Sequence, residues 1–170
     1  MEHIAKMLED VKDDMEQRLV DWKQAKHDIN DLQVKEAFNS LKANITTEEA
    51  SIVITYLRSS YITGTHQFKI ALYENVPFMN EATLYRLVDL TPLYQRTPEL
   101  IDQLTKKIRF QFKRIMPYEI EEIRRFCMEY FYKNSCFFFE KVLENIENDA
   151  ETISIYFGEE IGQIEKIGVI

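Results

Sequence analysis

The segment 117–149 constrains the fold most, because it is long, uninterrupted and apolar around most of its circumference. It opens with Pro117, which fits the first position of a helix, where its missing N–H costs nothing. At about 100° per residue, one face of such a helix collects Ile120, Ile123, Cys127, Phe131, Asn134, Phe138 and Val142. A helix this apolar is a buried one, so we expect the other elements to pack around this central helix.

A regular apolar repeat runs through residues 3–32 and predicts a long N-terminal helix. Its positions have the 3.5-residue spacing of a coiled-coil seam: Ile4, Leu8, Val11, Met15, Arg18, Trp22, Ala25, Ile29 and Leu32. We favour packing of this helix along the central helix, with formation of a homodimer through the same seam as the alternative. After Asp31 the apolar phase shifts, which predicts a bend and a second short helix over about 32–43.

Residues 46–62 fit a helix that begins with a capping box. Thr46 would be the N-cap and Glu49 would reach back to it, three residues on. We expect this helix to end near Ile62, with Gly64 in the left-handed conformation that follows many helices. Because 51–56 is rich in β-branched residues, a strand is the alternative there.

Two stretches of alternating apolar residues predict β-hairpins, one of 66–73 with 77–80 and one within 153–170. We expect the two hairpins to join in one antiparallel sheet, since an isolated hairpin is marginally stable. Residues 82–94 fit either a third strand or a short helix. Thr97, Pro98 and Glu99 indicate a helix start, and that helix should run to about Ile115, before Pro117.

These patterns predict an α+β fold that is predominantly helical, with a long N-terminal helix, a buried aromatic C-terminal helix and a small antiparallel β-sheet from two hairpins. A chain of 170 residues has the length of one domain. We therefore expect residues 1–170 to form a single domain in which residues 1–45 make a helical arm packed on the rest.

The cysteines and the N-terminus bear on the compartment. Cys127 and Cys136 are nine residues apart, on opposite sides of the predicted central helix, so they cannot bridge each other within it. The charged start shows no signal peptide, and no apolar run reaches membrane length. The sequence therefore predicts a cytoplasmic protein with two reduced cysteines.

The net charge of −8 is unevenly distributed along the chain. Residues 140–170 carry eight acidic and two basic side chains, whereas 99–133 carry eight basic and six acidic ones. Solubility alone explains an acidic excess; the sharper hypothesis is that the acidic end meets a basic protein partner. A nucleic-acid partner is disfavoured, because phosphate contacts require a dominant positive face, and no membrane partner is expected.

The segment 58–66 concentrates polar side chains at a predicted helix-to-strand junction, including Arg58, Ser59, Tyr61 and His66. Junctions on a rigid scaffold often carry sites, which makes this segment a candidate recognition site. Serine and threonine at junctions more commonly form local caps and turns, which is the simpler interpretation.

The remaining candidate motifs have structural explanations. His27 and Asp31 could share a helix face, but no second ligand pair has metal-binding spacing, so no metal is expected. The basic run 106–114 interleaves Phe110 and Phe112 as single-strand binders do, yet cations also suit the end of a helix. The aromatic run 137–139 fits core packing, and no cofactor is expected.

Without a catalytic motif, the sequence predicts a non-catalytic cytoplasmic protein-binding module. One specific form is an immunity protein that neutralises a basic toxin through its acidic end. The residues expected to carry that association are Glu147, Asp149, Glu151, Glu159 and Glu160. The alternative is a small-molecule sensor that uses the 58–66 junction, and an enzyme based on His66 ranks third.

Overall fold

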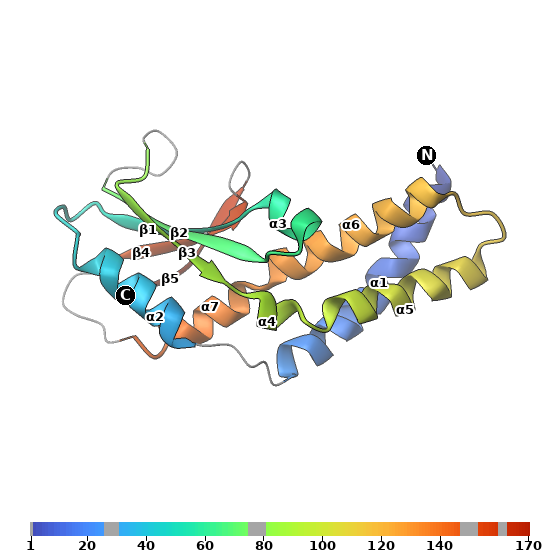
Figure 1. The fold of residues 1–170 in the computed structure, drawn as a ribbon, viewed down its shortest axis with the longest axis horizontal. Helices are drawn as coiled ribbons and strands as arrows, with labels where there is room; N and C mark the ends of the chain where they lie inside the picture. The colour runs from blue at the N-terminus through green and yellow to red at the C-terminus, as the bar shows by residue number, and fades with distance from the viewer. Residues whose placement is uncertain (1, 26–30, 75–80, 147–152, 160–162) are drawn as a thin grey trace. The chain divides into compact units, whose positions relative to one another are not determined.

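The computed structural model describes residues 2–25, 31–74, 81–146, 153–159 and 163–170 (Figure 1). The chain has an α+β fold made of two compact units. Unit 1 comprises Met1–His27 and Leu93–Asn134, and unit 2 comprises Asp28–Pro92 and Ser135–Ile170. The chain therefore passes from one unit to the other three times. Whether the two units form the single predicted domain, with residues 1–45 as an arm, stays a prediction.

Unit 1 is built from three long helices: α1 (Glu2–Gln24), α5 (Thr97–Gln111) and α6 (Pro117–Asn134). The helix α1 packs against both α5 and α6, which agrees with the favoured packing of the N-terminal helix. The buried residues of this unit come from all three helices: Met7, Val11, Met15, Trp22, Leu104, Ile108, Ile123, Cys127 and Phe131. The Trp22 ring meets the Phe131 ring edge-on, with 5.0 Å between their centroids.

The buried face of α1 differs in detail from the predicted seam. Met7 and Leu19 are buried although the seam omitted them, whereas Leu8 is half-buried. The buried positions of α1 are spaced four, four, four and three residues apart, as on the buried face of a helix that packs on two neighbours. Leu32, the last position of the predicted seam, lies in the next helix, Asp31–Lys42, and its side chain is 59% exposed.

Unit 2 holds a five-stranded mixed sheet with the strand order β3-β2-β1-β4-β5. The strands are β1 (Ser51–Tyr56), β2 (Gln67–Tyr73), β3 (Leu84–Asp89), β4 (Ser154–Glu159) and β5 (Ile164–Val169). The pair β1–β4 is parallel, and the other three pairs are antiparallel. The predicted hairpin within 153–170 (β4–β5) and the first strand of the other predicted hairpin (β2) thus join in one sheet. The expectation of a purely antiparallel sheet is wrong.

Two helices, α2 (Asp31–Lys42) and α7 (Cys136–Leu143), pack on the sheet of unit 2 (Figure 1). The Phe139 ring of α7 lies 5.6 Å from the ring of Phe68 on β2 and 5.8 Å from that of Phe157 on β4. Register pairs place Ile54 of β1 on the same face, between Ile70 and Phe157. All of these side chains are buried, so this face forms the core of unit 2.

The central helix is interrupted, which corrects the prediction of one helix over 117–149. The break falls at Ser135, a fully buried residue whose carbonyl accepts a hydrogen bond from Phe138 N at 3.1 Å. Just before it, Asn134 Nδ2 donates to the carbonyl of Tyr130 at 2.9 Å. Polar side chains that bond to nearby backbone in this way compete with regular helix bonding. The end of the predicted helix, 147–149, lies outside the described residues.

The favoured helix over 46–62 is also wrong, and the alternative strand is confirmed, because 51–56 forms the central strand β1. All six residues of β1 are buried, so burial on both sides of the sheet decides against the helix. The hydroxyl of Thr46 bonds to Glu74 Oε1, and that of Thr47 donates to the Glu74 carbonyl at 3.0 Å, in place of a capping box.

Three boundary details complete the comparison. Gly64 adopts the predicted left-handed conformation (φ 68°) at the end of the short helix α3, Arg58–Thr63. Strand β2 pairs with β1 on one side and with β3 on the other, and β3 is followed by the four-residue helix α4 (Thr91–Tyr94). The predicted hairpin partner 77–80 lies outside the described residues. Helix α5 ends at Gln111 instead of Ile115, because Phe112 already has extended backbone angles.

Candidate functional site

The 58–66 junction joins the central strand β1 to β2 through α3 and lies within unit 2. The structure describes Ser59 as exposed and His66 as buried, whereas the side chains of Arg58 and Tyr61 lie outside the described part. The backbone places all four residues on one short helix-and-turn segment between two strands, whereas the sequence favoured the end of a longer helix there.

Most hydroxyl groups of the junction take part in local hydrogen bonds. The Ser60 hydroxyl donates to the carbonyl of Gln67 at 3.3 Å, and the Thr63 hydroxyl donates to that of Ser59 at 3.0 Å. Thr63 Oγ1 also lies 2.9 Å from Thr65 Oγ1. These bonds stabilise the turn between α3 and β2, which is the structural role that serine and threonine commonly have at such junctions.

His66 has the most unusual environment in the junction. Its φ of 42° lies in the left-handed region, which non-glycine residues rarely adopt, and its carbonyl accepts a hydrogen bond from Leu90 N at 3.0 Å. Burial lowers the pKa of the imidazole below 6.5, and the negative charge of Asp89 opposes part of that shift. Both the direction of this shift and its cause favour the uncharged form of the side chain.

Asp89 is the residue that sequence reasoning missed at this junction. It ends β3, and its carboxylate accepts hydrogen bonds from the backbone N and the hydroxyl of Thr91, at 2.8 and 2.6 Å. The pairing of β2 with β3 places Asp89 opposite Gln67, next to His66 in the chain. The pairing of β2 with β3, which the sequence left open, brings the Asp89 carboxylate near the His66 imidazole.

The predicted acidic site is only partly described. Glu159 ends β4 as a half-buried residue paired in register with Tyr56 of β1. The other four residues, Glu147, Asp149, Glu151 and Glu160, lie outside the described part of the chain.

A second surface of unit 2, the sheet face opposite Phe139, carries exposed apolar side chains that the sequence did not single out. Tyr85 and Leu87, two residues apart on the edge strand β3, are 53% and 47% exposed. In register they face Ala71 and Lys69 of β2, and the Lys69 ammonium lies 5.4 Å from the Tyr85 ring centre. We call Tyr85, Leu87 and Lys69 the β3 patch. The alternation of 84–88 was the available signal, but the segment fitted a helix as well.

Charge divides unequally between the two units. Unit 2 contains 16 acidic and seven basic side chains, a formal charge of −9, whereas unit 1 contains 13 acidic and 14 basic ones, a charge of +1. The excess that the sequence placed at 140–170 is therefore part of a larger acidic excess that includes residues 28–92.

Three features of the described residues bear on metal binding, disulfide formation and membrane insertion. They contain no group of three or more histidine, cysteine, aspartate or glutamate side chains placed to hold a metal ion. Both cysteines are free, Cys127 buried and Cys136 half-buried. No helix within the described ranges combines the length and the apolar character needed to cross a bilayer.

Comparison with protein-family models, with curated proteins and with solved structures found no match to this chain.

Proposed function

We propose that this chain is a non-catalytic, cytoplasmic protein-binding module and that unit 2 recognises a basic protein. The observation that carries the proposal is the formal charge of −9 in a unit that also exposes Tyr85 and Leu87. Exposed apolar patches commonly mark protein interfaces. Complementary charge around such a patch accelerates association and excludes partners of the wrong sign.

One specific form of this function is an immunity protein that blocks a basic toxin. An acidic surface that covers a basic active region would neutralise it by occupying the groups that bind its own anionic substrate. The expected electrostatic residues are Glu147, Asp149, Glu151, Glu159 and Glu160, and the β3 patch would supply apolar contact area.

The test compares two variants in which five carboxylates become amides. The first changes the five expected residues of unit 2, and the matched control changes five exposed acids of α1: Glu9, Asp10, Asp13, Glu16 and Asp21. Both variants lose five charges from one chain. Wild type and the α1 variant should retain a basic protein from lysate of the source cells at low ionic strength, whereas the unit 2 variant should not.

Two results would overturn the proposal. One is equal loss of the basic protein by both variants, which would indicate attraction to net charge alone. The other is the absence of any basic protein bound by the wild type at low ionic strength. A Leu87→Asp variant sharpens the assignment, because it removes apolar area without adding positive charge and should still weaken the association.

A small-molecule site at the 58–66 junction is the second candidate. The observation that favours it is the backbone of His66, since residues held at positive φ are concentrated at functional sites. A metabolite that binds the folded junction should raise the melting temperature of wild type more than that of His66→Gln. Identical shifts in both proteins for every stabilising metabolite would place any binding elsewhere.

A further inference from the structure

The end of unit 1 where α5 meets α6 concentrates positive charge. Between Asp102 and Glu119 the chain contains no acidic residue and five basic ones: Lys106, Lys107, Arg109, Lys113 and Arg114. We call residues 106–118 the basic end. Stabilisation of a helix C-terminus explains cations in the last turn of α5, but Lys113 and Arg114 lie beyond it.

The same segment exposes large apolar side chains. Phe110 is 93% exposed, Tyr118 is 62% exposed and Met116 is 54% exposed. A phenylalanine this exposed contributes almost nothing to the core of unit 1. Scattered exposed apolar residues are ordinary, but three within nine residues, among cations, form a patch typical of interaction surfaces.

A hollow of about 400 Å³ lies at the basic end, within unit 1. Its apolar lining comes from Phe112, Ile115, Pro117 and Ile120, and its cationic lining comes from Arg109 and Lys113. This volume falls in the range of small ligand sites and accommodates one large side chain with its neighbours. Apolar and cationic groups therefore line one concave site.

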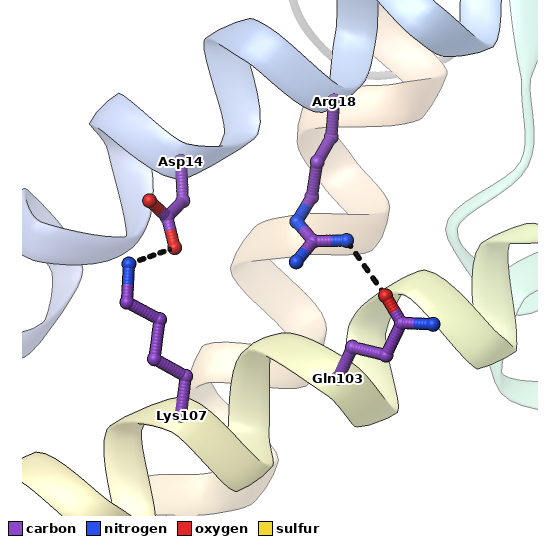
Figure 2. A network of polar contacts seen from close by, with 4 residues as sticks. All are labelled: Asp14, Arg18, Gln103 and Lys107. Carbon is purple, nitrogen blue, oxygen red and sulfur yellow. Dashed lines mark hydrogen bonds and ion pairs between the residues drawn. The ribbon is translucent and has the colours of Figure 1, made fainter.

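Two acidic side chains that contact this segment have other roles. Asp14 pairs with Lys107 at 2.6 Å, and both residues are drawn in Figure 2. Glu119 is only 5% exposed, and its Oε2 accepts a hydrogen bond from Met116 N at 2.8 Å, which caps α6. No carboxylate in the described part of the chain forms an ion pair with Arg109 or Lys113.

We propose that the basic end is a second binding site, for a short acidic segment of a partner protein. A large apolar side chain of that segment fills the hollow and packs beside Phe110, and flanking carboxylates pair with Arg109 and Lys113. This site lies in unit 1 and takes a ligand of opposite charge to the basic protein proposed for unit 2.

A short peptide fits these observations better than an extended polyanion. Unit 1 carries 13 acidic side chains as well as its 14 basic ones, so a bilayer or a long nucleic acid meets repulsion beyond the basic end, whereas a peptide meets charges only within about 10 Å. A concave hollow also suits one protruding side chain. Single-strand binders stack successive bases on several aromatic rings, and here only Phe110 is nearly fully exposed.

The test measures fluorescence anisotropy of a labelled peptide of alternating aspartate and glutamate with one central phenylalanine. The probe should bind wild type, and it should lose affinity when its acids become amides or its phenylalanine becomes serine. The double variant Arg109→Glu, Lys113→Glu should bind the peptide roughly tenfold or more weakly, because two charge-assisted contacts become repulsive. Phe110→Ser should weaken binding roughly fivefold or more through lost apolar contact.

The matched control is Lys12→Glu, Lys133→Glu, which makes the same change in charge at two exposed positions of unit 1 outside the basic end. It should bind within about twofold of wild type, since distant exposed charges are screened. Trp22 fluorescence verifies that each variant keeps unit 1 folded, because this residue is the only tryptophan and is buried there.

Each other outcome overturns the proposal. Equal weakening by the control would mean that net charge alone attracts the peptide. Binding to phosphatidylserine vesicles or to oligouridylate, with none to the peptide, would assign the basic end to a lipid surface or to RNA. Self-association that is abolished by Arg109→Glu, Lys113→Glu, again without peptide binding, would assign it to a second copy of the chain.

Discussion

Unit 1 and unit 2 differ in architecture and in charge, although each is assembled from two distant parts of the chain. Unit 1 is a set of three helices with a formal charge of +1, whereas unit 2 is a mixed sheet covered by helices with a charge of −9. The net charge of −8 describes neither unit well. Electrostatic arguments about partners therefore apply to the separate units, and opposite partners for the two units are compatible with one chain.

The variant with the largest expected effect tests whether the two units, which differ in charge, also unfold independently of each other. Phe139→Ala removes a fully buried ring that contacts Phe68 and Phe157, so it should lower the free energy of unfolding of unit 2 by about 3–5 kcal/mol. Hydrogen exchange of β1 and β2 during urea unfolding reports this loss, and Trp22 fluorescence reports unit 1.

The control for that experiment is Phe110→Ala, which removes an exposed ring and should change neither signal measurably. If Phe139→Ala shifts both signals by the same amount, the two units unfold as one cooperative structure. That result would remove the distinction in stability while leaving the distinction in charge.

The next effect concerns the aromatic core of unit 1. The Trp22 indole N–H donates to the carbonyl of Leu93 at 3.0 Å in a buried setting. Trp22→Phe leaves that carbonyl without this donor and should cost about 1–3 kcal/mol, measured by helical circular dichroism in urea. Tyr85→Phe on the β3 patch is the control and should cost less than about 0.5 kcal/mol. A loss seen only in hydrogen exchange of unit 2 strands would contradict this assignment.

The two units should also respond to opposite ends of the pH range. Burial raises the pKa of Cys127 in unit 1 from 9.0 to about 12, with a smaller opposing effect of Arg18. The unfolded thiol loses its proton near pH 9 and the folded one does not, so the stability of unit 1 falls between pH 9 and pH 12. Burial also raises the pKa of Tyr132, which adds loss above pH 10.

In unit 2 the sign is reversed. Because burial lowers the pKa of His66, the unfolded imidazole takes up a proton below pH 6.5 before the folded one does, and stability falls as the pH drops. The urea midpoint of each variant should therefore depend less on pH than that of wild type. Cys127→Ala should show this weaker dependence at alkaline pH, and His66→Gln should show it at acid pH. Unchanged slopes in both variants would show that other groups dominate.

The smallest expected effect lies on the surface of unit 1. Figure 2 shows two contacts between α1 and α5, the Asp14–Lys107 pair at 2.6 Å and the Arg18–Gln103 hydrogen bond at 2.9 Å. Asp14→Asn should cost about 0.2–1 kcal/mol, less at high salt, because half-exposed ion pairs contribute little. The neighbouring Asp13→Asn should be near neutral, and a loss for Asp14→Asn of more than about 2 kcal/mol would indicate that the pair fixes the position of the helices.

Local patterns in the sequence predicted much of the fold. Apolar spacing and helix-start signals located α2, α5 and the start of α6 to within a few residues, but not the end of α6, and alternation located β4 and β5. The strand β1 was only the alternative to a helix in the prediction, because the local capping signal competed with burial on both sides, which depends on neighbours distant in the chain. The parallel pairing of β1 with β4 has no local signal at all.

For the candidate sites, too, the sequence predicted local features but not contacts between distant residues. The sequence located the junction around His66, but the proximity of Asp89 depends on the pairing of β2 with β3. The basic run 106–114 was recognised and attributed to a helix end, because the exposure of Phe110 and the hollow beside Arg109 exist only in the folded chain. The exposure of Tyr85 and Leu87 likewise requires the sheet.

The position of β1 has a consequence for synthesis of the protein on the ribosome. Ser51 pairs with Tyr73 on one side and with Ser154 on the other, so one partner strand is made soon after β1 and the other more than 100 residues later. At about 5–20 residues per second, the second edge of β1 waits roughly 5–20 s for its partner. During that interval a strand with the apolar centre Ile52, Val53 and Ile54 presents an unpaired edge, which is a template for aggregation. The nascent chain therefore has a defined window in which chaperones have most to protect.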